Sequence, residues 1–317
     1  MKPGFSRDQR SIVASAAFVA LTIACCLTPA VTVGAAAART FKTADEAVHA
    51  LLDAAKASSL DALLGLFGPG GQELISSSDS TTAKQNRDVF VVAMAEGWKL
   101  VDKDATHKEL VLGHEEWPFP VPLVKSAQGW MFDTAAGKQE VLNRRIGKNE
   151  LAAIRISQTY VAAQKRYAEK GHDGKPAGIY ARRIASQPGK QDGLFWVTKP
   201  GEPLSPLGPL VAAAAAAGRQ VGPYGKKPVP FYGYYFRVLE QQGASAPGGI
   251  KNYLVNGEMS GGFSLIAWPA QYGATGIMTF IVGPDGSIRE KNLGPETATA
   301  VTKITAFDPD KTWSVAQ

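Results

Sequence analysis

Cysteine is nearly absent from this chain of 317 residues: the only two, Cys25 and Cys26, are adjacent and lie near the amino terminus. If the segment that contains them is removed, disulfides, thiolate nucleophiles and cysteine metal sites are all excluded. Histidine is also scarce, with residues at positions 49, 107, 114 and 172. No two of them are four residues apart, so the sequence has no zinc-binding helix motif.

The chain also lacks an apolar run long enough to cross a bilayer comfortably. The run from Ile12 to Leu27 has roughly 15 residues, whereas a membrane-spanning helix needs about 20. It follows the cations Lys2, Arg7 and Arg10 and precedes the small residues of positions 34–38. This order predicts a secretory signal peptide over residues 1–38, with an uncleaved amino-terminal anchor as the alternative. After cleavage, no transmembrane segment is expected.

The two cysteines leave a second alternative for this segment. Leu21 to Cys25 loosely resembles a bacterial lipoprotein box, although the leucine stands one place too early. Lipidation through Cys25 or Cys26 is therefore an alternative to a soluble exported chain.

A large charge excess is missing once this leader is set aside. The whole chain has a formal net charge of +6, of which the leader contributes +2 through Lys2, Arg7 and Arg10 against Asp8, leaving +4 for the other residues. Their basic residues are scattered, apart from short clusters at 144–148, 182–183 and 226–227. Because no basic stripe with interleaved aromatic residues accompanies the export signal, we expect no nucleic-acid partner.

Motifs for catalysis or metal binding are weak or missing. His114-Glu115-Glu116 offers metal ligands but is better explained as a polar strand end. His172-Asp173-Gly174 lacks the further acidic positions of a calcium loop. The hydroxyls of 76–78 have no nucleophile elbow around them, and the glycine-rich stretch 243–249 does not join a strand to a helix as phosphate loops do. We assign no catalytic residue, no metal and no cofactor.

What the sequence contains predicts an α+β protein of two parts. Residues 41–145 begin with helical patterns, including a capping-box spacing from Thr43 to Glu46, and continue as short strands. The polar stretch 76–86 is predicted to be a loop. The residues Pro122 to Lys125 and Gly129 to Asp133 resemble the closing hairpin of cystatin-like and nuclear-transport-factor-2-like domains, which implies a helix packed on an antiparallel sheet.

The second part, residues 146–317, is predicted to begin with a helix over Lys148 to Lys170, with Asn149 as its N-cap. An antiparallel sheet follows within Pro228 to Glu296, where apolar and aromatic residues alternate between glycines. Pro284-Asp285-Gly286 predicts a tight turn into a charged edge strand. A long Pro- and Gly-rich loop over 187–225 joins helix to sheet.

This second part resembles a type IV pilin. The resemblance rests on the helical residues 149–154 and on the sheet residues 262–286, including Trp268-Pro269 and Gly276 to Phe280. It implies a long helix packed on an antiparallel sheet. The long apolar first half of a pilin helix is absent and a whole domain stands in its place, so the resemblance does not imply filament assembly.

Across nearly the whole chain after the leader, the sequence resembles an exported bacterial family known as domain of unknown function 2950. The residues that carry this resemblance are Leu66 to Pro69, Arg144 to Gly147 with Asn149 and Glu150, Gln241 to Gly243, Ala246 to Gly249, Tyr253, Gly257 to Met259, and Leu293 to Thr297. The resemblance implies a shared location and fold, and no activity.

Two groups of residues are candidates for ligand binding. Arg144, Arg145 and Glu150 lie at the predicted domain junction, where ligand sites often occur, although an ion pair with a helix cap explains them structurally. Tyr232, Tyr234 and Trp268, with Tyr235, are candidates for a stacking platform for a glycan or peptide, with core packing as the alternative.

These features give three hypotheses for an exported protein of the cell envelope, periplasmic or secreted. The first is a binding or structural role without catalysis, with an envelope protein or a glycan as partner. The second is a hydrolase acting on an envelope polymer. The third is an assembly partner of a pilus-like or secretion apparatus.

Overall fold

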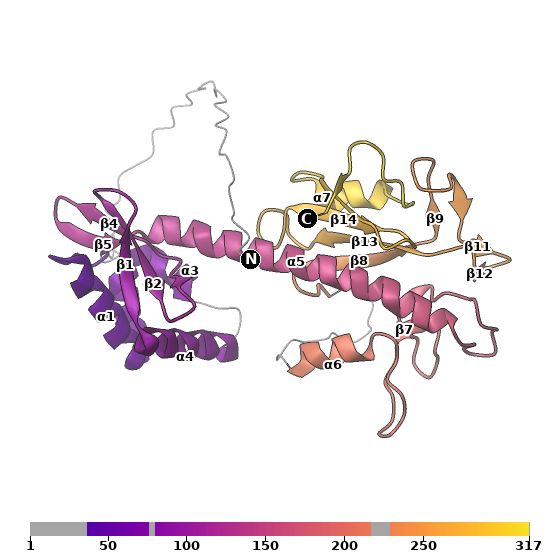
Figure 1. Ribbon diagram of the computed structural model, residues 1–317, viewed down its shortest axis with the longest axis horizontal. Coiled ribbons are helices and arrows are strands. Elements are labelled where there is room, and N and C mark those ends of the chain that lie inside the picture. Colours follow the sequence, from indigo (N-terminus) through magenta and orange to yellow (C-terminus); the bar gives the residue numbers. More distant parts are fainter. Residues whose placement is uncertain (1–36, 76–79, 217–228, 317) are drawn as a thin grey trace, which may run out of the picture. The chain divides into compact units, whose positions relative to one another are not determined.

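Helices and antiparallel sheets are both abundant in the protein, which is α+β as predicted (Figure 1). The computed structural model describes residues 37–75, 80–216 and 229–316. The segment 1–36 of the predicted leader, with Cys25 and Cys26, and positions 217–225 of the predicted long loop lie outside these residues. The charged cluster at 226–227 does so as well.

The amino-terminal group of elements has four helices and one antiparallel sheet, whose strand order is β1-β2-β4-β5 with β3 paired to β2. Its elements are α1 (Ala44–Lys56), α2 (Leu60–Phe67), η1 (Gly68–Gly70), α3 (Gly71–Ile75), α4 (Ser80–Glu96), β1 (Trp98–Asp102), β2 (His107–Leu112), β3 (Trp117–Pro118), β4 (Leu123–Ser126) and β5 (Gly129–Phe132).

Local sequence signals place most of these elements. The Thr43 hydroxyl accepts a hydrogen bond from the backbone N–H of Glu46 at 3.2 Å, as an N-cap does. The predicted hairpin around Gly129 is confirmed, because β4 pairs with β5 and Gly129 has a φ of +124°. The loop predicted for 76–86 is wrong from Ser80 onward, since α4 begins there. The loop was predicted because this stretch has no apolar periodicity, and the first turns of a polar helix do not have one either.

One apolar core holds this group together. Helix α1 contributes Val48 and Leu51, and the sheet contributes Leu110, Leu123 and Phe132. These five side chains are almost fully buried. Burial of large apolar side chains on both sides of the helix–sheet interface is what favours this packing over an exposed helix.

The long helix α5 (Thr134–Ala168) differs from the helix that the sequence predicted. Its N-cap is Asp133, whose carboxylate accepts the Ala136 N–H at 3.0 Å. Asn149 is therefore not an N-cap but an interior residue. The helix has 35 residues, and the predicted domain boundary at 145/146 falls inside it. The sequence did not predict one continuous helix across Gly147 and the pair Arg144-Arg145, because glycine and clusters of charge usually indicate helix ends.

The carboxy-terminal group contains the predicted central sheet, with strand order β16-β15-β14-β13-β8 and every pairing antiparallel. Its elements are β6 (Arg183–Ala185), β7 (Gly193–Phe195), α6 (Gly208–Ala216), β8 (Tyr234–Leu239), β9 (Gln241–Gln242), β10 (Lys251–Asn252), β11 (Leu254–Val255), β12 (Glu258–Met259), β13 (Ser264–Pro269), β14 (Met278–Val282), β15 (Ile288–Asn292), α7 (Thr297–Ala300), η2 (Val301–Lys303) and β16 (Ser314–Val315).

The central sheet is covered on both faces. On one face, Tyr160 and Val161 of α5 pack with Leu265 and Phe280 of the sheet. On the other face, Ile266 and Ile281 pack with Val301 and Phe307 from the carboxy-terminal segment. Successive residues of a strand point to opposite faces, so β13 and β14 supply both cores.

The turn predicted at Pro284-Asp285-Gly286 is confirmed. It joins β14 to β15, and Gly286 has a φ of +83° and donates its N–H to the Gly283 carbonyl at 3.1 Å. The edge position predicted for the following strand is wrong, because β16 pairs with Arg289 and Glu290 of β15. The two residues of β16 are too short a segment to have a recognisable strand pattern.

Candidate functional site

Arg144 and Arg145, adjacent on α5, have different environments. The Arg144 side chain donates to the Glu140 carboxylate at 2.7 Å and to the Pro118 carbonyl at 2.8 Å, and it stacks over the Trp117 ring. Arg145 is exposed. The two therefore do not converge on one point, and Arg144 fastens α5 to β3.

Glu150 fastens α5 to the central sheet. Its Oε1 accepts hydrogen bonds from the backbone N–H groups of Ile277 at 2.8 Å and Met278 at 3.0 Å. The neighbouring Asn149 amide donates to the Thr275 carbonyl at 2.9 Å. We call Asn149, Glu150 and the segment 275–278 the α5 latch. Glu150 and Arg144 hold different strands, so the predicted junction site is not assembled as one cluster.

The predicted aromatic platform is divided between the two faces of the sheet. Tyr234 is fully buried, donates its hydroxyl to the Met278 carbonyl at 2.9 Å and packs on Phe280. Burial, with the nearby Glu150 carboxylate, raises the pKa of Tyr234. Trp268 instead lies on the opposite face, beside Tyr235.

Tyr232 is not part of strand β8. It precedes the strand, has a φ of +51° and packs its ring edge-on against Phe231. With Tyr234 in the core on one face and Trp268 on the other, no shared stacking surface is formed by the three predicted residues. Strand alternation predicts this division once the strand is known to begin at Tyr234.

A cavity of about 380 Å³ lies elsewhere in the carboxy-terminal group, where α5 ends. Its volume is in the range of small-ligand sites. Lining residues come from the end of α5, from the segment that leads into β6 and from the residue before β7. Others come from the residue between β8 and β9 and from the start of β12. They are Tyr167, His172, Asp173, Lys175, Ile179, Tyr180, Arg182, Arg183, Asp192, Glu240 and Glu258.

Three ion pairs surround this cavity. Arg182 donates from both Nε and Nη2 to Oε1 of Glu240, at 3.0 and 2.8 Å. Lys175 pairs with Glu258 at 2.9 Å. Arg183 lies 3.5 Å from Asp192. Cations and carboxylates are thus both presented to the cavity, each held by a partner of opposite charge.

Tyr167 and His172 form the aromatic wall of the cavity. Their rings are stacked, with centroids 4.1 Å apart and planes inclined by 18°. The Trp196 ring packs edge-on against His172, at a centroid distance of 5.5 Å. Tyr167 and His172 line the cavity next to the ion pairs, and Trp196 supports His172 without lining the cavity.

Gln191 fixes this wall in place. The Tyr167 hydroxyl donates to the Gln191 carbonyl at 2.6 Å, and Nδ1 of His172 lies 3.1 Å from the Gln191 side-chain oxygen. The Gln191 N–H is itself bound by the Asp173 carboxylate at 2.8 Å. Burial, assisted by the negative charges of Asp173, Asp192 and Glu258, raises the pKa of Tyr167 to about 12. The phenol is therefore a neutral donor at physiological pH.

Within the described residues, the weaker metal-binding motifs are not assembled into a metal site. His114 is largely exposed and lies 3.9 Å from Glu96, and Glu116 pairs with Lys99. Within residues 37–75, 80–216 and 229–316, no group of three His, Cys, Asp or Glu side chains has the geometry to hold a metal ion. Positions 76–79, with the hydroxyls considered above, lie outside the described residues.

Sequence reasoning did not find this cavity. It noted the turn at His172-Asp173-Gly174 and the pair Arg182-Arg183, but Tyr167, Glu240 and Glu258 had no local signal. The turn and the arginine pair are ten residues apart, and both contribute side chains to the lining of the cavity. In the sequence, the cavity was indicated only by a pair of charged residues close to a glycine-containing turn at a helix end.

One protein-family model matches almost all of the chain after the predicted leader. Residues 38–316 match the family described as protein of unknown function, DUF2950. The chain belongs to this family. No curated protein and no solved structure matches it, so the pilin-like resemblance of the second part is not confirmed. The match of DUF2950 begins at residue 38, where the predicted leader ends.

Proposed function

We propose that this DUF2950 protein is exported to the bacterial cell envelope and acts there by binding a small polar ligand in the cavity at the end of α5. The observation that carries this proposal is the cavity lining, in which three ion pairs surround a wall of stacked aromatic rings. The basic, apolar and small-residue order of positions 1–38 supports export. No helix of the described residues is long and apolar enough to cross a membrane.

The lining favours a ligand that carries both charge signs. Arg182, Lys175 and Arg183 offer donors to anionic groups, and Glu240, Glu258 and Asp192 accept from cationic ones. A neutral sugar would leave these charges without new partners, whereas a short peptide or an amino sugar with an acidic substituent would match them. Tyr167 and His172 add aromatic side chains to the same lining, which can contact the apolar parts of such a ligand.

The same geometry argues for binding rather than hydrolysis. Acid–base catalysis requires a carboxyl group that is free to exchange a proton with substrate. Each cavity carboxylate already has a partner: Glu240 has Arg182, Glu258 has Lys175, Asp192 has Arg183, and Asp173 has the Gln191 N–H. A ligand in the cavity would therefore meet carboxylates that already have partners within the protein.

An assembly role has less support. Pilus-like assembly by strand addition needs an open sheet edge. In the central sheet, β16 pairs with β15, and β6 lies close to β8 without pairing to it. The β15 edge is thus partly occupied by a short segment of the same chain.

Native mass spectrometry of the protein purified from the envelope fraction of its own host tests the proposal. We expect the protein in that fraction, with an additional mass of a few hundred daltons bound. The variant Arg182→Met should lose the bound mass, and Lys303→Met, at an exposed lysine of η2, should retain it. A protein that remains in the cytoplasm contradicts the export proposal, and a ligand-free protein contradicts the binding proposal.

A further inference from the structure

The solvent-facing side of α5 and of the turn that follows it carries a row of cations. Between positions 145 and 170, six basic side chains are exposed, and Glu169 is the one exposed acidic residue. We call these six basic residues the α5 basic row. They are Arg145, Lys148, Arg155, Lys165, Arg166 and Lys170.

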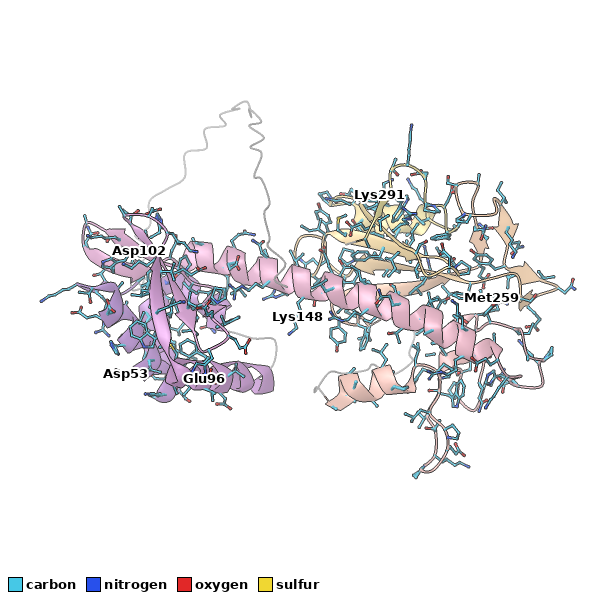
Figure 2. The ribbon with its side chains drawn as sticks, viewed as in Figure 1. Asp53, Glu96, Asp102, Lys148, Met259 and Lys291 are labelled. Atoms are coloured by element: carbon cyan, nitrogen blue, oxygen red, sulfur yellow. The ribbon has the colours of Figure 1, made fainter. Side chains whose placement is uncertain are left out.

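Three members of the row lie almost on one straight line. Lys148 and Arg155 are seven residues apart, and Arg155 and Arg166 are eleven residues apart. At about 100° per residue, both spacings return to within about 20° of the same side of a helix. At about 1.5 Å per residue, the line from Lys148 to Arg166 is about 27 Å long. Lys148 is labelled on α5 in Figure 2. Arg145 and Lys170 extend the row beyond its two ends.

Among the described residues, the row has no carboxylate partner in an ion pair, in contrast to the start of the same helix. Lys138 pairs with Glu73 and Arg144 with Glu140. Within the part of the chain that the structure describes, no carboxylate lies within ion-pair distance of any member of the row. The half-buried Glu150 of this segment is occupied by the backbone of the α5 latch. The row is therefore a line of six cations in which Glu169 is the one exposed negative charge.

The surface around the row indicates the kind of partner. Its exposed uncharged residues include Leu151, Gln158 and Ala162, and none is aromatic. Base stacking needs aromatic platforms, so the row would contact phosphate groups without reading bases. The opposite side of α5 is buried in the core, and Leu151 is the one large apolar side chain exposed on this helix. The helix thus has no apolar face free for insertion into a bilayer.

We propose that the α5 basic row is a docking surface for a linear polymer that carries a phosphate group in each repeat. A line of cations matches a partner whose charges also repeat along a line. Arginine and lysine both bind phosphate, and contacts of this type release counterions from the polymer. The proposal does not depend on the cavity, because no residue of the row lines it.

Binding of the purified protein to inorganic polyphosphate of about one hundred units, measured by fluorescence anisotropy across a salt series, tests the proposal. The triple variant Lys148→Gln, Arg155→Gln and Arg166→Gln should bind at least about tenfold more weakly, and its slope of log affinity against log salt should fall by about 2. The control Lys56→Gln, Lys190→Gln and Lys303→Gln removes the same charge from three exposed lysines elsewhere. It should keep most of the affinity and the slope.

Three results would overturn the proposal. The first is the absence of polyphosphate binding by the unchanged protein. The second is an equal loss in the control triple variant, which would show that net charge alone determines binding. The third is binding to vesicles of phosphatidylglycerol without binding to polyphosphate, which would assign the row to a lipid surface. Circular dichroism of both triple variants excludes loss of folding as the cause of a change.

Discussion

Oε1 of Glu150, in the middle of α5, lies 3.0 Å from the backbone nitrogen of Met278, at the first residue of β14. Because the same oxygen also accepts the N–H of Ile277, one helix side chain sets where this central strand begins. The sequence indicated Glu150 as a candidate ligand-binding residue, and in the structure its carboxylate binds backbone N–H groups at the start of β14.

Removal of the Glu150 carboxylate should destabilise the protein. Glu150→Ala leaves two half-buried N–H groups without their charged acceptor, and we expect a loss of about 2–3 kcal/mol in the free energy of unfolding. Urea denaturation measures it. Glu169→Ala, at an exposed position after the same helix, should change stability by less than about 0.5 kcal/mol. Equal effects of the two substitutions would show that the hydrogen bonds of Glu150 in the α5 latch do not contribute to the free energy of unfolding.

Alanine substitutions at Gly276 and Gly147 test how closely side chains pack beside the α5 latch. A Cβ on Gly276 would overlap the buried Tyr234 hydroxyl, so Gly276→Ala should destabilise by about 1–3 kcal/mol. A Cβ on Gly147, inside α5, meets no atom within 4 Å. Gly147→Ala should therefore stabilise the helix by about 0.5–1 kcal/mol. Thermal unfolding compares both. Stabilisation by Gly276→Ala would contradict the packing of Tyr234.

The adjacent arginines of α5 should differ in their contribution to stability. Arg144→Ala removes the hydrogen bond to the Pro118 carbonyl and the stacking on Trp117, and we expect a loss of about 1–2 kcal/mol. Arg145→Ala, at an exposed position, should change stability by less than about 0.5 kcal/mol. Chemical denaturation of both variants measures the difference. A larger effect at Arg145 would indicate that Arg144 does not fasten β3.

Stability should decline above pH 10 because of the raised pKa of Tyr167. Its folded-state pKa of about 12 exceeds the ordinary value of 10.0, so the unfolded chain loses the phenolic proton first. The contribution of Tyr167 is complete below pH 10 and is lost as pH rises towards 12. Tyr167→Phe should make the decline between pH 10 and 12 shallower, as followed by urea denaturation at several pH values. An unchanged slope would contradict the burial of this phenol.

The features that the sequence predicted correctly depend on neighbouring residues. Thr43 caps α1 through a contact three residues away, and the turn at Gly286 needs only its own four residues. Turn and cap chemistry is local, and a single sequence shows it directly.

The features that sequence reasoning missed depend on contacts between distant positions. Glu150 meets the backbone of a strand 127 residues away, and Arg182 meets Glu240 at a separation of 58 residues. Trp268 and Tyr234 were grouped by composition, but the register of β13 and β8 places them on opposite faces. No local pattern reports which segments become neighbours, so the cavity could not be predicted.

Hydrogen–deuterium exchange is the measurement that would detect ligand binding in the cavity at the end of α5. It would compare the protein purified from the envelope fraction of its own host with the same chain produced in a foreign host. We expect slower exchange in the protein from its own host for segments 167–183 and 239–259, which contribute most of the lining. Indistinguishable exchange in these segments, or protection confined to the amino-terminal group, would contradict ligand binding in this cavity.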